Sequence, residues 1–306
     1  VTEQRGPGVD TITLTMLSCW LPVSLASTLA PPSAIVIGGS SGMGRAAAIA
    51  VASRGGSVLL ASRTQARLDS AADDIRREVP DAQLTTRVLD ARDEAAVKAF
   101  GEELEGRWDA LICTAAGRAP HGPIGELDTA DTAALFDSKF WTAHNVCKHL
   151  APRLADGGAV ALTAGLLNRR PGMNCSPLAA VNGALEGLTR ALALEFGPRL
   201  RVNCLSPGFC DTERFDHMPA ERKAAMLANT AASLPLRRVG APSDMGEALY
   251  YLVSAPFVTG VVLDCDGGHH IRQYADASSD PMRAGGGDVE LSAWRESKRR
   301  GATAGE

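Results

Sequence analysis

The sequence predicts an α/β fold, in which a doubly wound parallel sheet of seven strands forms a single domain with flexible tails. Short apolar runs alternate with amphipathic helical stretches from Ser33 to about Ile271, the pattern of βαβ units whose sheet is covered on both faces. Right-handed crossovers then place helices on both sides of the sheet. The 306 residues suffice for one domain of roughly 250 residues with additional tails.

Seven short apolar runs are the predicted strands, at residues 34–38, 57–61, 83–89, 110–115, 159–164, 200–206 and 260–265. Six helical patterns lie between them, at residues 42–54, 64–78, 93–105, 129–155, 178–196 and 243–254. Asp93 and Ser243 are predicted N-caps, because their side chains can accept a hydrogen bond from the first turn of a helix.

The remaining segments are predicted to be peripheral. Residues 209–235 contain a short helical pattern at about 219–230 and are typical of a lid. Residues 1–32 are expected to be a flexible N-terminal extension, because their apolar stretch is interrupted by a proline and follows a net negative segment, unlike a secretory signal. Residues 272–306 have few apolar side chains and many charges of both signs, which indicates a flexible tail.

Composition and charge argue against several classes of protein. Apolar residues make up 45% and charged residues 22% of the chain, as in an ordinary globular protein. The formal net charge is −4 and the arginines are scattered, so neither nucleic acid nor a membrane is an expected partner. The seven cysteines form no C-x-x-C pair and have no metal-spaced histidines, which predicts a reduced, cytoplasmic location and no metal site.

A glycine-rich turn lies between the first strand and the first helix. It comprises Gly38, Ser40, Ser41, Gly42, Met43 and Gly44. Glycine lets the backbone turn sharply, approach a pyrophosphate closely and present the helix N-terminus to its negative charge. Because the glycines directly follow a strand and precede a helix, they predict a Rossmann-like dinucleotide site.

The end of the second strand indicates which dinucleotide binds. An NAD site usually has Asp or Glu there, whereas this chain has Ser62 and Arg63. Arg63 can hold a 2′-phosphate in a forked geometry, so NADP(H) is the predicted cofactor; a solvated surface charge is the alternative. After the third strand, Asp90 could accept a hydrogen bond from the adenine amine, with Ala91 behind it, or could cap a helix.

Together these residues resemble the short-chain dehydrogenase/reductase (SDR) family over about residues 33–271. The spacing Gly-x-x-x-Gly-x-Gly is the family's own variant. Further matches are ARD around Asp90, TAAG at 114–117, RVNCLSPGFCDT at 201–212 and RVGAPSDM toward the end. The resemblance implies a small-molecule substrate and a homo-dimer or homo-tetramer that associates through the two long helices. It also implies cofactor contacts for Ala116, Gly117, Pro207, Gly208 and Thr212, the last three beside the nicotinamide.

The positions that carry the family's proton chemistry hold other residues here. The family's catalytic Ser follows the fifth strand, where this chain has Ala164. The signature Tyr-x-x-x-Lys belongs at the start of the next long helix, where LAAVN supplies Leu178 and Asn182. The helix residue that is usually Asn is Lys139. No displaced pair exists, since none of the three tyrosines is followed by Lys four places on.

Lys139 and Asn182 are therefore the candidate catalytic residues, and both are also candidates for binding the cofactor. Desolvation would lower the pKa of Lys139 and make it a general acid, or a retained charge would stabilise an oxyanion. An anchor for ribose or phosphate and a structural salt bridge are the alternatives. Asn182 could donate to a ribose hydroxyl or simply pack.

Several loop residues are expected to line the substrate crevice. They are His121, Arg169, Arg170, Phe209, Phe215, His217 and Met218. The two arginines could hold an acidic group of a substrate or could belong to a solvated loop. His217 could act as an acid, although a place in the pocket wall is the more usual role.

These observations predict an atypical NADP-dependent oxidoreductase that transfers a hydride between NADP(H) and a small organic substrate, such as a ketone, enone or imine, without the usual Tyr acid. Because the cofactor carries the hydride, a substrate that needs little acid assistance can still react. Two alternatives stay open: an NADP-binding isomerase or cyclase, and a catalytically silent SDR-like binding subunit.

Overall fold

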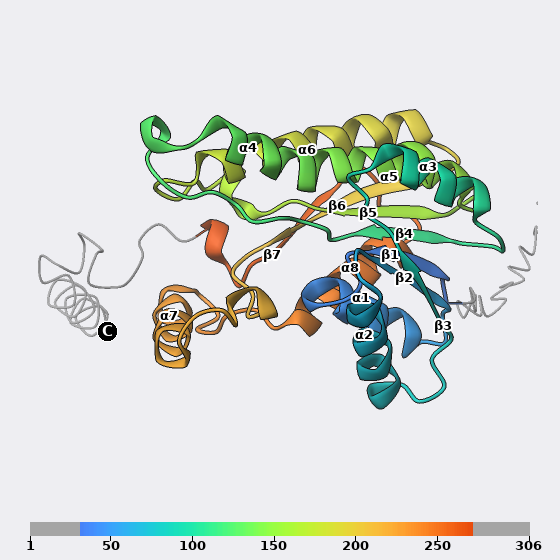
Figure 1. The fold of residues 1–306 in the computed structure, drawn as a ribbon, viewed down its shortest axis with the longest axis horizontal. Helices are drawn as coiled ribbons and strands as arrows, with labels where there is room; N and C mark the ends of the chain where they lie inside the picture. Colours follow the sequence, from blue (N-terminus) through green and yellow to red (C-terminus); the bar gives the residue numbers. More distant parts are fainter. Residues whose placement is uncertain (1–30, 272–306) are drawn as a thin grey trace, which may run out of the picture.

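A computed structural model describes residues 31–271 and places a seven-stranded parallel sheet at their centre (Figure 1). The strands are β1 (Ala34–Ile37), β2 (Val58–Ser62), β3 (Leu84–Val88), β4 (Ala110–Cys113), β5 (Ala159–Thr163), β6 (Arg201–Pro207) and β7 (Val262–Cys265). Their order is β3-β2-β1-β4-β5-β6-β7, with every neighbouring pair parallel, which confirms the predicted fold class. The predicted tails lie outside the described residues, apart from residues 31 and 32.

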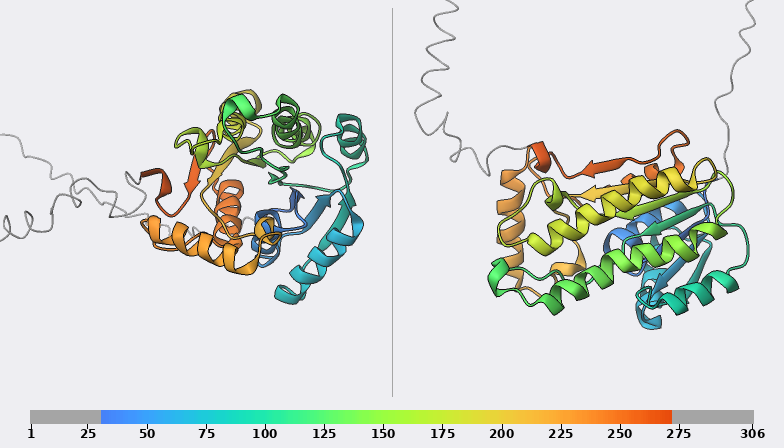
Figure 2. Two further views of the ribbon diagram at one scale, coloured as in Figure 1. Left: turned by 60° about the vertical axis from the view of Figure 1, so that its left-hand side comes forward. Right: turned by 90° about the horizontal axis from the view of Figure 1, so that it is seen from above.

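Helices cover both faces of the sheet (Figures 1 and 2). One layer contains α1 (Gly42–Ala52), α2 (Gln65–Glu78) and α8 (Pro242–Ser254). The other contains α3 (Glu94–Glu103), α4 (Thr129–Phe136), α5 (Thr142–His149) and α6 (Ser176–Phe196). Helix α7 (Ala220–Ser233) belongs to neither layer: it stands apart in Figure 1, and none of its residues is buried.

Two apolar cores hold the layers to the sheet. All residues of β1 and β4 are buried, and their side chains alternate between the faces. Ile35 and Leu111 pack into one core, Val36 and Ile112 into the other. A strand covered on both sides needs a continuous apolar run, which is why these strands show no alternation of polar and apolar residues.

One predicted helix is divided in the structure. Where the sequence pattern predicts a single helix over 129–155, α4 leads through a π-helical turn, Asp137–Trp141, into α5 and then a 3₁₀ turn, Ala151–Arg153. A π turn holds more residues than an α turn, and such turns occur frequently at functional sites. Lys139 lies in the π turn and is buried.

The helix caps agree with prediction in one case and differ in the other. Asp93 caps α3, because its side chain accepts a hydrogen bond from the first turn. The prediction that Ser243 caps α8 is wrong: α8 begins at Pro242, and the Asp244 carboxylate accepts a hydrogen bond from the backbone N–H of Ala241. Proline suits the first helical position because its missing N–H would have no partner there.

Candidate cofactor and active site

The glycine-rich turn joins β1 to α1 at the carboxyl edge of the sheet, where the strand order reverses between β1 and β4. Gly38 and Gly42 have φ angles of 85° and 51°, which residues with a side chain rarely adopt. Gly44 has no space for a side chain, because a Cβ there would lie 2.3 Å from the Gly38 carbonyl oxygen. The backbone therefore requires glycine at all three positions of the motif.

The N-terminus of α1 contacts a negatively charged group. The backbone N–H of Gly42 donates to Oε2 of Glu213 over 2.9 Å. The N-cap residue Ser41 makes no capping hydrogen bond through its side chain, and the first turn of α1 contains no acidic residue. A pyrophosphate offers the same kind of acceptor, a negatively charged oxygen. The turn therefore fits the pyrophosphate of a dinucleotide.

Two arginines lie in the part of the cofactor site that is expected to hold the adenosine. Arg63 is exposed after β2, and its positive charge helps to lower the pKa of Asp90, so the two groups lie near each other. Arg67, in the first turn of α2, donates to Oγ of Ser41 over 3.1 Å. Arg67 is not among the predicted residues, although a basic residue one helical turn after Arg63 is a usable signal.

Asp90 is held as a carboxylate and does not cap α3. The Arg92 side chain donates to both of its oxygens, with the Nη2–Oδ2 distance at 2.5 Å, and the Arg92 backbone N–H donates to Oδ1. The side-chain hydrogen bond from Arg92 is the main cause that lowers the pKa of Asp90. An ionised Asp90 retains lone pairs for an adenine amine, and Ala91 beside it is buried.

The segment after β6 lies against the ends of β7 and α1. A Cβ at Gly208 would lie 2.6 Å from Cα of Asp266, so only glycine fits after Pro207. A Cβ at Gly42 would lie 3.3 Å from Cγ2 of Thr212. Thr212 therefore lies beside the glycine-rich turn, next to Glu213.

The loop after β4 meets the π turn. The Gly117 backbone N–H donates to Oγ of Ser138 over 3.1 Å, and a Cβ at Gly117 would lie 2.4 Å from the same oxygen. Ala116, the preceding residue, is exposed. Gly117 therefore makes a close contact with Ser138, the residue that precedes Lys139.

Lys139 and Asn182, which the sequence predicts as partners in one site, lie in direct contact. The Lys139 Nζ donates to Oδ1 of Asn182 over 2.6 Å and to the backbone carbonyl oxygen of Ala164 over 2.8 Å. Lys139 is 7% exposed and Asn182 1%. No acidic side chain in residues 31–271 pairs with Lys139, so the structural salt bridge considered as an alternative is not formed there.

Burial lowers the pKa of Lys139 from its ordinary 10.5 to about 8. Removing the ammonium from water disfavours its charged form, and the positive charge of Arg214 acts in the same direction. Both hydrogen-bond acceptors of Nζ are neutral oxygens, so neither raises the pKa of Lys139 as a carboxylate would. A lysine of this pKa exchanges its proton near neutral pH.

The positions at which the family usually has its catalytic Ser and Tyr carry apolar side chains in this chain. Ala164 directly follows β5 and is buried, and Leu178 lies half-buried in the first turn of α6. Tyr250 and Tyr251, the tyrosines within the described residues, belong to α8 in the opposite helical layer. The guanidinium carbon of Arg54 lies over the ring of Tyr250, 4.3 Å from the ring centre.

The two arginines after β5 have partners within the protein. Arg169 forms a two-pronged ion pair with Asp264 of β7 and a further one with Glu186 of α6, at N–O distances of 2.5 to 3.2 Å. Arg170 donates to the backbone carbonyl oxygen of His270. Arg169 is exposed after β5, as the loop interpretation expects, but its guanidinium is held in these ion pairs.

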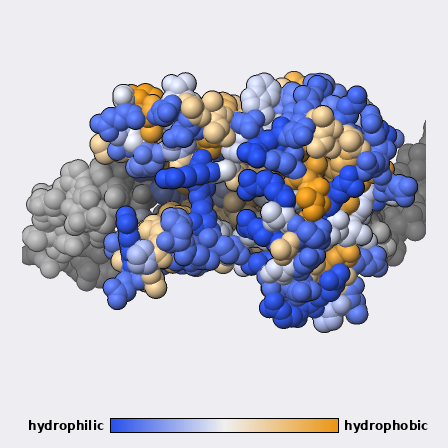
Figure 3. All heavy atoms as spheres, in the orientation of Figure 1, coloured by the Kyte–Doolittle hydropathy of each residue, from blue (hydrophilic) through white to orange (hydrophobic). Residues whose placement is uncertain are grey.

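The predicted lid, residues 209–235, comprises a 3₁₀ turn η5 (Glu213–Phe215), α7 and their connections, and is called the lid segment below. Phe209 and Phe215 stack at its base with ring centres 5.1 Å apart. His217 is exposed, and its Nδ1 lies 2.9 Å from the Arg214 carbonyl oxygen in the same turn. The molecular surface is hollowed between α7 and the layer that contains α4 (Figure 3).

The comparisons place the chain in a family. The sequence profile described as "Enoyl-(Acyl carrier protein) reductase" matches residues 38–270. The chain is 31% identical to the cis-4-hydroxycyclohexanecarboxylate dehydrogenase of Sinomonas cyclohexanicum over 77% of its length and 95% of the relative's. It is also 31% identical to the short-chain dehydrogenase/reductase ATR9 of Stachybotrys chlorohalonatus, over 79% and 98% of the two chains. The chain belongs to the short-chain dehydrogenase/reductase family and is an oxidoreductase of that type.

Solved structures agree with this assignment. A small-chain dehydrogenase in complex with NADPH has a TM-score of 0.67 and 33% identity, over 79% of this chain and 99% of that one. An NADPH-bound short-chain oxidoreductase from Pseudomonas aeruginosa, described as containing an atypical catalytic centre, has a TM-score of 0.71 and 25% identity, over 79% and 97%. Both proteins were solved with the reduced cofactor that the sequence analysis predicts for this chain.

Two kinds of feature are absent from the part of the chain that the structure describes. None of the helices within residues 31–271 is long and apolar enough to cross a membrane. In the same part of the chain, no group of three or more His, Cys, Asp and Glu side chains is arranged to hold a metal ion.

Proposed function

We propose that this chain is an NADP(H)-dependent oxidoreductase in which Lys139, rather than a tyrosine, handles the proton. The observation that carries the proposal is the buried Lys139 amine, held by Asn182 and by the carbonyl oxygen of Ala164. These residues occupy three positions at which the family usually has Asn, Lys and Ser. The substrate class is a small ketone, enone or imine.

The cofactor would be held along the carboxyl edge of the sheet. The glycine-rich turn, from Gly38 to Gly44 with Ser40, Ser41 and Met43, would bind the pyrophosphate. Arg63 and Ser41 would bind the 2′-phosphate, and Asp90 with Ala91 the adenine. Ala116, Gly117, Pro207, Gly208 and Thr212 would line the ribose and nicotinamide, with Lys139 and Asn182 beneath. When bound, NADP(H) supplies or accepts the hydride.

The hydrogen-bond arrangement lets Lys139 gain and lose a proton without disturbing its partners. An ammonium group has three hydrogens, and two of them are directed at Asn182 and Ala164. A neutral amine still has two hydrogens, so both acceptors remain satisfied after the third proton leaves. Within residues 31–271 no other acceptor contacts Nζ, which leaves that third hydrogen for a substrate oxygen or a ribose hydroxyl.

The direction of reaction fixes the role of the proton. In reduction, an Nζ–H bond breaks and an O–H bond forms as the substrate oxygen receives the electron pair of its carbonyl double bond. In oxidation, the neutral amine takes the proton from the alcohol. Because the pKa of Lys139 is lowered to about 8, both protonation states are accessible near neutral pH.

The apolar neighbours favour substrates that need little additional polarisation. Ala164 and Leu178 offer no hydroxyl to the substrate oxygen, so Lys139 is the only polar group proposed to contact it. A conjugated enone spreads its developing charge, and a cyclic imine is already basic. Such substrates are therefore favoured over an isolated, unactivated ketone.

The family's association through its long helices stays a prediction for this chain. Trp141, in the π turn, is 49% exposed, and Leu194, on α6, is 86% exposed. Both lie in the two segments that would form the contact between subunits, and burying them would remove apolar surface from water. The proposed assembly is a homo-dimer or homo-tetramer.

The test compares wild type with Lys139→Met, and with Lys148→Met as the control. Lys148 is an exposed lysine of α5, paired with Glu94. NADPH affinity is measured by titration, and turnover by the absorbance of the reduced cofactor across ketones, enones and cyclic imines. We expect Lys139→Met to bind NADPH within a few-fold of wild type and to lose turnover by about 100- to 10,000-fold.

Three results would contradict the proposal. Loss of NADPH binding in Lys139→Met makes the lysine an anchor for the cofactor. Unchanged turnover in this variant means that another group delivers the proton. A wild-type protein that binds NADPH tightly but oxidises it with no compound in the screen favours the isomerase or the silent binding subunit.

A further inference from the structure

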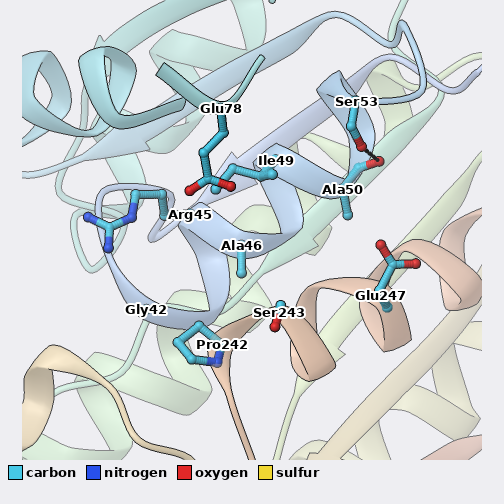
Figure 4. A pocket seen from close by; sticks show the side chains of 10 residues that line it. All are labelled: Gly42, Arg45, Ala46, Ile49, Ala50, Ser53, Glu78, Pro242, Ser243 and Glu247. Atoms are coloured by element: carbon cyan, nitrogen blue, oxygen red, sulfur yellow. Dashed lines mark hydrogen bonds between the residues drawn. The ribbon is translucent and has the colours of Figure 1, made fainter. Parts of the chain in front are cut away.

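Glu213 reaches from the lid segment to the cofactor turn. It is the first residue of η5, and 171 positions separate it from Gly42. Its Oε2 accepts the hydrogen bond from the Gly42 backbone N–H over 2.9 Å, and its Oε1 accepts one from Nη2 of Arg45 over 2.5 Å. Figure 4 shows Gly42 and Arg45 together on the first turn of α1.

We propose that Glu213 is an internal competitor of the cofactor's pyrophosphate, so that binding of NADP(H) must displace Glu213 and release the lid segment. This inference rests on the proposed binding of NADP(H). The carboxylate uses the backbone N–H and the helix N-terminus that a pyrophosphate would use, and the first turn of α1 contains no acidic residue of its own.

Charge prevents the two groups from sharing the turn. A pyrophosphate bound at Gly42 would bring negative oxygens against the Glu213 carboxylate, and like charges at contact distance repel. Arg45 does not cancel this repulsion, because its Nη1 is already paired with Asp74 over 2.7 Å. If Glu213 leaves, Nη2 of Arg45 becomes free to donate to a phosphate oxygen.

Ion pairs connect α7 of the lid segment to the turn that carries Glu213, so we expect the two to move together. Lys223 of α7 pairs with Asp211 and Asp216, which flank η5, at 3.0 and 2.8 Å. These ion pairs connect α7 to the turn that carries Glu213. Since no residue of α7 is buried, displacing the segment exposes no core of that helix. Leu234, at the far end, is buried and provides a fixed point.

The first experiment measures binding of NADPH and of inorganic pyrophosphate by isothermal titration calorimetry to wild type, Glu213→Gln and Glu221→Gln. Glutamine keeps the size of the side chain and removes its charge. Glu221 is an exposed carboxylate in the first turn of α7 and serves as the matched control. Glu213→Ala, which also removes the contact with Gly42, provides a second variant should glutamine still occupy the turn.

We expect Glu213→Gln or Glu213→Ala to bind both ligands roughly tenfold more tightly than wild type, while Glu221→Gln changes neither affinity by more than about twofold. Affinities equal to or weaker than wild type in both Glu213 variants overturn the proposal. If NADPH binds to none of the proteins, the proposed function fails, whereas the pyrophosphate titration still decides whether Glu213 competes.

The second experiment follows the lid segment by hydrogen exchange. Pyrophosphate has no nicotinamide with which to close the site, so in wild type it should accelerate amide exchange over residues 213–223 by displacing Glu213. In Glu213→Ala these amides should already exchange at the faster rate, with no further change on adding pyrophosphate. Exchange in wild type that does not respond to bound pyrophosphate would show that the lid segment is not coupled to the turn.

Discussion

Removing the proton from Lys139 should stabilise the folded protein. Burial lowers the pKa of this amine to about 8, whereas an unfolded chain titrates at the ordinary 10.5. Below pH 8 both states carry the proton, and the folded state bears the full cost of the buried charge. Between these two pKa values the unfolded state binds more protons, so the free energy of unfolding rises with pH.

The size of the effect follows from the shift. Each pH unit between the folded and the unfolded pKa contributes about 1.4 kcal/mol. Raising the pH from 7 to 9 crosses about one such unit, from 8 to 9. The free energy of unfolding should therefore rise by about 1 kcal/mol through Lys139. Buried thiols act in the opposite direction from about pH 9, where an unfolded thiol ionises, because desolvation raises the pKa of Cys113 to about 11 and that of Cys204 to about 12. The contribution of the lysine is therefore isolated by comparing two proteins that contain the same thiols.

The assay is urea unfolding of wild type and Lys139→Met without cofactor at pH 7, 8 and 9. Methionine has a similar length and no titrating group, and the contribution of the thiols cancels in the difference between the two proteins. That difference should shift by about 1 kcal/mol in favour of wild type as the pH rises. Lys148→Met should show no such shift. A difference between wild type and Lys139→Met that stays constant from pH 7 to 9 would refute the lowered pKa.

Two further substitutions test the cofactor site. Arg63→Ala should weaken NADPH binding by about 10- to 100-fold and NADH binding only a few-fold, because a charge-assisted contact worth about 1.5–3 kcal/mol is made only to the 2′-phosphate; equal losses for both nucleotides would contradict the assignment. Gly44→Ala should lower the free energy of unfolding by about 1–3 kcal/mol in thermal melts, because its Cβ would lie 2.3 Å from the Gly38 carbonyl oxygen. In Gly187→Ala the new methyl meets nothing within 4 Å, so no destabilisation is expected.

The fold could be predicted because its signals are local. The apolar runs of β1 and β4 and the glycines of the first turn depend on burial and backbone conformation within a few residues. The boundaries of α8 were harder, since Pro242 and Ser243 are both acceptable helix starts and the contact between Asp244 and Ala241 decides between them. The π turn at Lys139 has no local signature, because its residues also suit an ordinary α-helix.

The candidate site was predictable only where a motif fixes a position in the fold. The pairing of Lys139 with Asn182 follows from the places that both residues take in the family pattern. Contacts between distant segments without a motif were not foreseen, such as Glu213 with Gly42 across 171 positions and Arg169 with Asp264 across 95. Such contacts depend on how loops meet after the sheet has formed, which the residue types alone do not reveal.

The bond between Lys139 and Asn182 also constrains how such a site can arise from the usual family arrangement. In an ancestor with Asn at the first position and Lys at the second, acquiring Lys139 first would place two amines in one buried site, where their mutual repulsion would disfavour the charged form of both. Losing the lysine at position 182 first gives two asparagines, which can coexist but leave the site without an amine. Both single replacements therefore change the charge of the buried site, and we expect related sequences seldom to carry lysine at both positions.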